Sequence, residues 1–128
     1  MIAGLGSDIC NIERIADSYR RFGERFLKRC YGNNERRELP PENSEKKYYA
    51  SLAKRFAAKE AFSKALGTGF NYGLSWVEIE ILHNENGKPY ICLSGKAAEM
   101  AEEQKIKNIL VSLSDDYPFA QAVVILEV

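Results

Sequence analysis

The chain has 128 residues, of which 45% are hydrophobic and 28% are charged, as in ordinary globular proteins that bury a core. The formal net charge is zero, but the charges are distributed unevenly. Residues 1–66 hold 14 lysines and arginines against 9 aspartates and glutamates, whereas residues 67–128 hold 4 against 9. The basic first half predicts an anionic partner for this part of the chain.

Three cysteines, Cys10, Cys30 and Cys92, match no zinc-ligand spacing and no CxxC redox motif. We therefore expect free or buried thiols in a reducing compartment. No apolar run is long enough to cross a membrane, and Asp8 follows the N-terminus too closely for a secretory signal. These features predict one cytoplasmic domain over residues 1–128, with no membrane contact.

The first predicted element is a short strand over residues 2–7 that ends at Asp8, where the chain passes into a helix. Gly4 and Gly6 weaken this strand, and glycines at such positions allow another backbone or a ligand to come close. Asn11 is a plausible N-cap for a helix with an apolar stripe from Ile12 to Phe22. A loop or capping carboxylate is the simplest interpretation of Asp8.

The first helix and its continuation, residues 14–29, carry six basic residues against only two acidic ones. A solvated helix face and a docking surface for an acidic partner both account for this pattern. Nucleic acid is a weaker candidate, because no aromatic or glycine-rich recognition elements are interleaved with the charges.

Residues 31–45 are polar and contain Pro40-Pro41, which predicts a short helical turn and a loop. Ser44 is a candidate cap for a long helix over residues 45–66, and Gly67 is a candidate left-handed residue at its end. Glu60 and Lys64 lie on neighbouring turns of this helix, as an ordinary surface ion pair would.

Alternation of apolar and acidic residues predicts a strand over residues 76–82, and Asn86-Gly87 predicts a hairpin to residues 89–93. An amphipathic helix over 96–105 and a second hairpin, residues 109–114 and 120–126, complete the chain. His83, the only histidine, is predicted to be a surface residue without a partner motif.

One histidine is poor material for a catalytic triad, and no Walker or G-x-G-x-x-G motif is present, so carboxylates and cations carry the candidate chemistry. If Asp8 and Glu60 met in space, their hard oxygens would suit Mg²⁺ beside a substrate phosphate. Such a centre would be surrounded by positive charge, supplied by Lys46, Lys47, Arg55, Lys59 and Lys64. Spacing alone does not bring the two carboxylates together.

Two motifs give the chain a resemblance to a known family. Gly6-Ser7-Asp8, followed by Arg14 on the next helix, is similar to the first motif of the holo-[acyl-carrier-protein] synthases. The run from Arg55 through Lys59, Glu60 and Lys64 to Gly69 resembles their second motif, which has the form W/F-x-x-K-E-x-x-x-K. The distance between the motifs, the hairpin at Asn86-Gly87 and the strand that ends at Ser114 also fit, so the resemblance covers essentially the whole chain.

The resemblance implies an α+β fold with a long central helix on a mainly antiparallel sheet, and homotrimers with active sites between protomers. It implies Mg²⁺-dependent transfer of 4′-phosphopantetheine from coenzyme A to a serine of acyl carrier protein, which releases adenosine 3′,5′-bisphosphate and supports fatty acid biosynthesis. Asp8 and Glu60 would be the metal ligands, and Lys64 would neutralise charge on the pyrophosphate. A metal-ordered water or a carboxylate would take the serine proton.

The resemblance also implies binding roles. Lys46 and Lys47 would lie near the 3′-phosphate of coenzyme A, with Arg55 as support, and Arg14, Arg21 and Arg25 would bind the acidic recognition helix of the carrier. In one respect the chain departs from the family pattern, because many members have histidine where Ser114 is here followed by Asp115. Any role of that histidine is not transferable.

Two other functions remain open on the sequence. A non-catalytic module that binds carrier protein or nucleotide would keep the cations, but it would not need Asp8, Glu60 and Lys64 together. A nucleic-acid binder would show strongly salt-dependent affinity.

Overall fold

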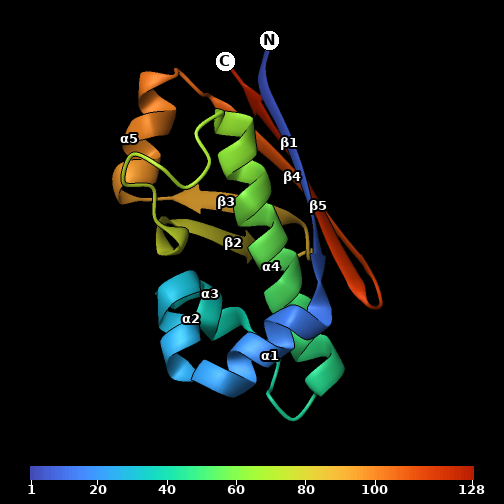
Figure 1. The fold of residues 1–128 in the computed structure, drawn as a ribbon. Coiled ribbons are helices and arrows are strands. Elements are labelled where there is room, and N and C mark those ends of the chain that lie inside the picture. Colours follow the sequence, from blue (N-terminus) through green and yellow to red (C-terminus); the bar gives the residue numbers. More distant parts are fainter.

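The computed structural model describes all residues 1–128, and Figure 1 shows how the elements are arranged. No helix is both long enough and apolar enough to cross a lipid bilayer. In chain order the elements are β1 (Ile2–Asn11), α1 (Ile12–Phe22), α2 (Glu24–Cys30), α3 (Asn33–Glu38), α4 (Glu45–Leu66), a 3₁₀ turn η1 (Trp76–Glu78), β2 (Ile79–His83), β3 (Pro89–Leu93), α5 (Gly95–Glu103), β4 (Asn108–Asp116) and β5 (Phe119–Glu127).

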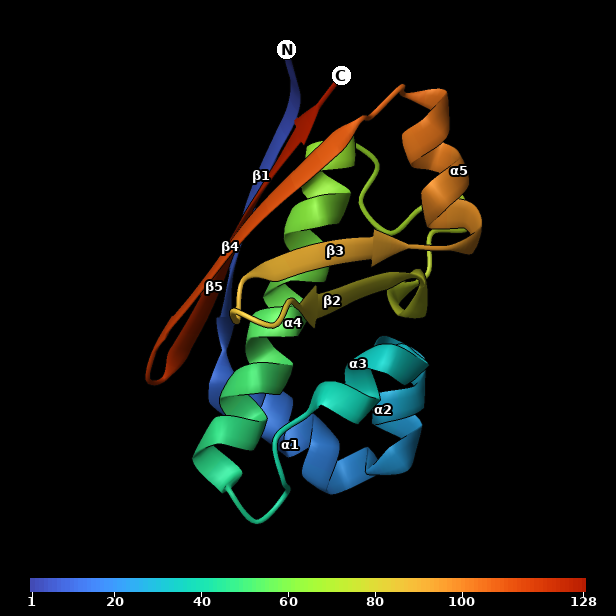
Figure 2. The same ribbon diagram turned by 180° about the vertical axis from the view of Figure 1, so that it is seen from behind.

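Two antiparallel sheets form the β part of the fold. The larger has the order β1-β5-β4, so β1 and β4 are its two edges, and the smaller is the β2-β3 hairpin. The long helix α4 lies along one face of the larger sheet, and no element covers the other face in either view (Figures 1 and 2). The arrangement confirms the predicted α+β class with a central helix on a mainly antiparallel sheet.

The central helix α4 begins and ends where the sequence predicts. Gly67 follows it in the left-handed conformation, with φ of 84°, and its N–H donates to the Lys64 carbonyl. Ser44 occupies the N-cap position, but its side chain makes no capping hydrogen bond. The predicted cap at Asn11 is confirmed, because its Oδ1 accepts from the Glu13 N–H at 2.9 Å.

Strand β1 approaches α4 so closely that two of its residues have no room for a side chain. A Cβ on Gly4 would lie 2.2 Å from the Ala65 carbonyl oxygen, and one on Gly6 would lie 2.0 Å from that of Ala61. The predicted close approach at these glycines is thus a contact between strand backbone and helix backbone. It draws the strand onto the alanine-rich side of α4.

Strand β1 is longer than predicted, and this changes the position of Asp8. The strand continues to Asn11, so Asp8 pairs with Ala122 inside the ladder and does not stand at the junction with α1. The prediction of a loop or capping carboxylate was therefore wrong. Since side chains alternate along a strand, Asp8 lies on the same face as Gly6, the face that packs on α4.

Two other predicted elements have different bounds. Residues Trp76–Glu78 form a 3₁₀ turn, so β2 begins only at Ile79. The fifth helix is Gly95–Glu103 rather than residues 96–105, and its first turn is held by Glu78, whose carboxylate accepts from the Lys96 N–H at 3.1 Å. Both hairpins are confirmed.

We expect Gly6→Ala to lower the free energy of unfolding by at least about 2 kcal/mol, because the new methyl group would overlap a helix carbonyl that cannot easily move. Urea denaturation measures the change. Ser7→Ala is the matched control, since Ser7 is exposed on the other face of the same strand. Equal stabilities of the two variants would show that the contact does not constrain β1.

Candidate active site

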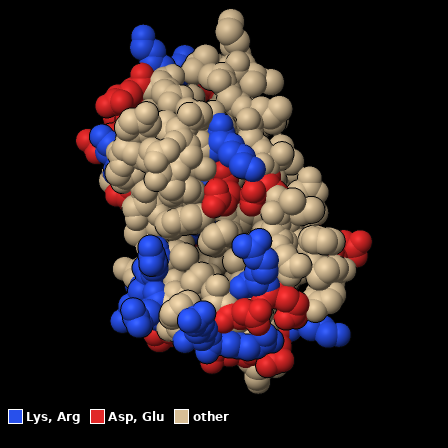
Figure 3. Space-filling model, in the orientation of Figure 1, with Lys and Arg blue, Asp and Glu red and all other residues tan.

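Asp8 and Lys64 are brought together across the junction of β1 and α4. The Lys64 amine donates to Asp8 Oδ1 at 3.0 Å and to the Ser7 carbonyl at 3.0 Å. About half of the Lys64 side chain stays exposed, against 18% for Asp8. Figure 3 shows a small group of acidic and basic side chains near the middle of this face, over the line where α4 and β1 lie side by side.

Glu60 lies one helical turn before Lys64, and its carboxyl group is close enough to Asp8 to feel its charge. The pKa of Glu60 is raised, first by partial burial and then by repulsion from Asp8, while Lys64 acts in the opposite direction. No ion pair joins Glu60 to Lys64 in the structure, since Lys64 turns to Asp8 instead. The ordinary surface pair is therefore replaced by a cluster of two carboxylates and one amine.

Arg14 lies near the cluster of Asp8, Glu60 and Lys64, because Arg14, Asp8 and Glu60 all act on the thiol of Cys10. The pKa of its thiol is raised to about 11, mainly by burial and by Asp8, with Arg14 lowering it and Glu60 raising it further. The basic helix α1 thus begins beside the carboxylate cluster. The raised pKa also keeps the thiol protonated and unreactive at neutral pH.

The exposed side of α1 and α2 is free to bind an anionic partner. Arg14, Arg21 and Arg25 are all exposed, and none of them forms an ion pair. Arg20 differs, because Glu13 and Asp17 neutralise it. Basic side chains gather over this lower end of the molecule in Figure 3.

An apolar hollow of about 390 Å³ lies beside these arginines, between α1, α2, α4 and the 3₁₀ turn. Its walls include Phe22, Phe26, Phe56 and Trp76, and Arg25 stands among them. The Trp76 ring is stacked on Phe56, with 4.5 Å between ring centroids. Sequence patterns do not predict this hollow, because its aromatic residues come from separate elements.

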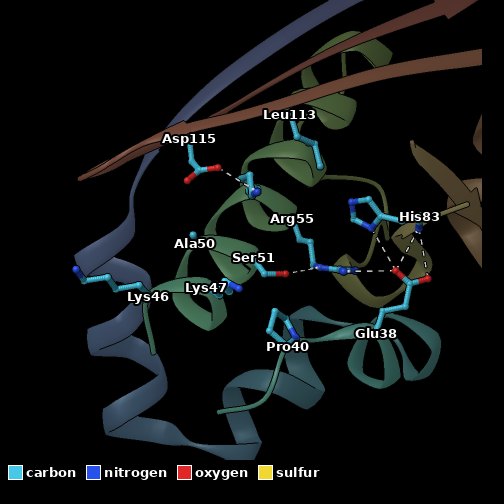
Figure 4. Close-up of a pocket in the computed structure, with 11 residues that line it drawn as sticks. Glu38, Pro40, Lys46, Lys47, Ala50, Ser51, Arg55, His83, Leu113 and Asp115 are labelled. Atoms are coloured by element: carbon cyan, nitrogen blue, oxygen red, sulfur yellow. Dashed lines mark hydrogen bonds and ion pairs between the residues drawn. The ribbon is translucent and has the colours of Figure 1, made fainter. Parts of the chain in front are cut away.

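A second, larger pocket of about 690 Å³ opens at the N-terminal half of α4 (Figure 4). Its basic lining residues are Lys46, Lys47, Lys54 and Arg55, and its acidic ones are Glu38 and Asp115. Lys46 and Lys47 are exposed and form no ion pair, although the Lys46 amine points away from Arg55 in Figure 4. The structure therefore places the three predicted cofactor-binding residues around one pocket.

Arg55 is built into the wall of this pocket rather than extended into it. Only 3% of its side chain is exposed, and its guanidinium donates to Ser51 Oγ, to the Ile81 carbonyl and to Glu38. Glu38 also accepts from the His83 backbone N–H at 3.1 Å and lies 3.2 Å from His83 Nδ1. His83, for which the sequence offered no partner motif, therefore has Glu38 as its partner at a partly exposed position.

Lys59 is fully buried, so its predicted place around the carboxylate cluster was also wrong. Its amine donates to Glu35 Oε1 at 2.6 Å and to the carbonyls of Trp76 and Ile79. Burial lowers the pKa of Lys59, and Glu35 acts against that shift. Removing one partner of a buried pair costs about 3–5 kcal/mol, which makes this contact structural.

The carboxylate cluster and the pocket lie on opposite sides of α4. Ser51 lines the pocket and precedes Glu60 by nine residues, which is about two and a half helical turns. The sheet gives the same result, because Asp8 is on edge strand β1 and Asp115 is on the other edge strand, β4. Within one chain, α4 therefore separates the two groups of candidate residues.

Comparison with known proteins identifies the family of the chain. The family model of the 4′-phosphopantetheinyl transferase superfamily matches residues 4–122. A holo-[acyl-carrier-protein] synthase of Vibrio cholerae is 47% identical over 127 residues, covering 99% of this chain and 98% of that protein. The chain belongs to the 4′-phosphopantetheinyl transferase superfamily.

Solved structures of the superfamily agree with this assignment. Holo-[acyl-carrier-protein] synthase from Neisseria meningitidis superposes with a TM-score of 0.86 at 39% identity, covering 99% of each chain. The Helicobacter pylori enzyme in complex with coenzyme A gives a TM-score of 0.80 at 35% identity, over 96% of this chain and 99% of that one. Both the fold and the family resemblance drawn from the two motifs are confirmed.

Several residues of this phosphopantetheinyl transferase became visible only in the structure. Lys54 pairs with Asp115 inside the pocket at 3.0 Å, and Glu35 holds Lys59. A signal for the second pair was present in the sequence, because Lys59 falls on the α4 stripe that includes Leu52, Phe62 and Leu66. A lysine on a buried stripe requires a carboxylate partner.

Proposed function

We propose that this protein is a holo-[acyl-carrier-protein] synthase that transfers 4′-phosphopantetheine from coenzyme A to a serine of apo-acyl carrier protein. The proposal rests on the cluster of Asp8, Glu60 and Lys64, which a module that only binds its partners would not need. In the reaction the serine oxygen bonds to the phosphorus that carries pantetheine. The pyrophosphate P–O bond breaks, and adenosine 3′,5′-bisphosphate leaves.

The two carboxylates suit the Mg²⁺ that the family implies. Partial burial and then the charge of Asp8 raise the pKa of Glu60, and the two carboxylates offer the hard oxygen donors that this ion prefers. Two carboxylates are the usual protein contribution, with water and substrate phosphate completing the shell. Bound there, Mg²⁺ would neutralise charge on the pyrophosphate and polarise it.

Lys64 supplies the other positive charge of the reaction site. Asp8 and the Ser7 carbonyl hold its amine in place, while about half of the side chain remains exposed for contact with substrate. A fixed cation stabilises the charge that develops on the leaving phosphate without reorganisation. The serine proton has a carboxylate or an ordered water available to accept it.

The pocket at Lys46 and Lys47 suits the nucleotide end of coenzyme A. Two unpaired amines favour a phosphate monoester, and the guanidinium of Arg55, which Glu38 holds in the wall, supports this part of the pocket. The volume of about 690 Å³ is within the range of cofactor sites. In one chain, however, α4 would stand between this nucleotide and the carboxylate cluster.

A homotrimer removes that obstacle. The uncovered face of the large sheet exposes apolar side chains that water disfavours, namely Leu5, Ile9, Leu110 and Phe119. If the sheets of neighbouring protomers meet there in a closed ring, the cluster at one sheet edge can face the pocket at the opposite edge of the next protomer. Each reaction site would then be shared between two chains.

The basic side of α1 and α2 suits the acidic recognition helix of the carrier. Arg14, Arg21 and Arg25 are unpaired, and the aromatic hollow beside Arg25 can receive an apolar side chain of the same helix. Because Arg14 and the carboxylate cluster both act on Cys10, a carrier bound on α1 lies next to the reaction site.

We expect Glu60→Gln to lower the rate of carrier modification by about 100-fold or more, because one of two charged oxygen ligands is lost. Its stability should change by less than about 1 kcal/mol, since the substitution also removes repulsion from Asp8. Mass spectrometry of apo-carrier incubated with the protein, coenzyme A and Mg²⁺ measures the transfer.

Glu102→Gln, at an exposed position of α5, is the control for this experiment and should be fully active. A carrier that stays unmodified at high concentrations of the native protein would contradict the proposed function and leave a binding module. Full activity of Glu60→Gln would remove Glu60 from the reaction site.

Arg14→Glu should weaken carrier binding about tenfold and leave coenzyme A binding nearly unchanged, because a charge reversal at the dock repels the acidic helix. Isothermal titration with each partner separates the effects. Lys107→Glu makes the same reversal at an exposed position far from α1 and should affect neither. Similar losses for both partners would show that α1 is not a carrier dock.

The native protein should sediment as a trimer, and Leu5→Asp should dissociate it and abolish transfer, because a charge would be buried in the interface. Leu5→Ile keeps the apolar surface and serves as the control. A native monomer that transfers phosphopantetheine at full rate would refute the shared site.

A further inference from the structure

The ion pair of Lys54 and Asp115 in the basic pocket is partly exposed, unlike the buried contacts by which Arg55 and Lys59 hold the fold together. The Lys54 amine lies 3.0 Å from Asp115 Oδ1, and both residues line the pocket. Roughly a third of each side chain is exposed. Asp115 is the next-to-last residue of β4, and its carboxylate reaches Lys54 at the edge of the pocket (Figure 4).

The pair is weak and can be broken, in contrast to the other cation contacts of the pocket. Partly exposed ion pairs are screened by water and are worth little. Arg55 cannot leave its partners, because it is 97% buried and bonded to a side-chain oxygen, a backbone carbonyl and Glu38. Lys54 is therefore the one paired lysine or arginine of the pocket that can turn to an incoming anion.

We propose that Asp115 limits the affinity of this pocket for a phosphate monoester by competing with it for Lys54. This inference rests on the proposed function, and the phosphate concerned is the 3′-phosphate of coenzyme A. When it enters, Lys54 exchanges the Asp115 carboxylate for a phosphate oxygen, and the carboxylate is left facing water. Lys54 and Asp115 together then determine discrimination between coenzyme A and its 3′-dephospho form.

Competition between Asp115 and the phosphate for Lys54 would also affect the release of product. The 3′-phosphate is present both in coenzyme A and in the released adenosine 3′,5′-bisphosphate, so a pocket that binds it too tightly also retains the product. Lys46 and Lys47 attract the phosphate without competition, because neither has an ionic partner. Asp115 offsets part of that attraction, which favours product release.

Asp115→Asn tests the inference by removing the charge and keeping the shape. Isothermal titration of the native protein and of the variant with coenzyme A and with 3′-dephospho-coenzyme A gives the ratio of the two dissociation constants for each. We expect Asp115→Asn to tighten coenzyme A about three- to fivefold at low salt, the range of a partly exposed charge pair, and to leave the dephospho form unchanged. Adenosine 3′,5′-bisphosphate should inhibit the variant more strongly.

Glu102→Gln is the matched control, because Glu102 is an exposed acid of α5, away from the pocket and from the uncovered sheet face, and its loss changes the net charge equally. It should not alter the ratio. Lys54→Gln should reduce the preference for coenzyme A, and Asp115→Asn should add little in that background.

Three outcomes would overturn the inference. Native protein that binds both ligands equally would show that no 3′-phosphate reaches the pocket. Weaker coenzyme A binding by Asp115→Asn would show that Asp115 positions Lys54 and does not compete for the ligand. Equal tightening by Glu102→Gln would show a general charge effect. Carrier modification by the native protein is measured separately, so each of these results leaves the proposed transfer standing.

Discussion

The contact between the β1 backbone and the α4 backbone is the constraint on which the candidate active site depends. Gly4 and Gly6 leave no space between the strand and the helix carbonyls of Ala61 and Ala65. Asp8 is the next residue on the same face of β1, so its carboxylate is delivered to the adjoining turns of α4, beside Lys64. A side chain at either glycine would separate the strand from the helix. The glycines are therefore part of the site, although they carry no chemistry themselves.

Ion pairs between α4 and α3 hold the side of α4 that faces away from β1. Arg55 and Lys59 are one turn apart, and they bind Glu38 and Glu35 of α3 together with backbone carbonyls of the β2 segment. Buried ion pairs of this kind contribute little net stability, but they are directional, and a rotation of α4 would leave charges unpaired. The helix is thus held in one rotational setting, which places Glu60 and Lys64 at the surface beside Asp8.

Local sequence predicted most elements, and it failed where distant groups act on the backbone. Helix 45–66, both hairpins and the Asn11 cap follow from short-range signals. The strand predicted from Trp76 begins only at Ile79, because residues Trp76–Glu78 form a 3₁₀ turn, in which the Trp76 carbonyl accepts from the distant Lys59 amine. Asp8 and Glu60 lie 52 residues apart, so only the family resemblance could join them. Lys59 and Lys64 are both lysines on one helix, and only the tertiary packing separates the buried one from the free one.

The carboxylate cluster and the basic pocket lie on opposite sides of α4. Within one chain, a substrate bound in the pocket therefore cannot reach the cluster. The uncovered apolar face of the sheet is a second feature that one chain does not explain. The proposed ring would account for both, since protomers joined through their sheets would cover that face and bring opposite sheet edges together. The proposed function is also compatible with a net charge of zero and an excess of basic residues in the first half of the chain. In the proposed function the basic half would bind the anionic nucleotide and the acidic carrier, and the two carboxylates would lie where phosphate is transferred.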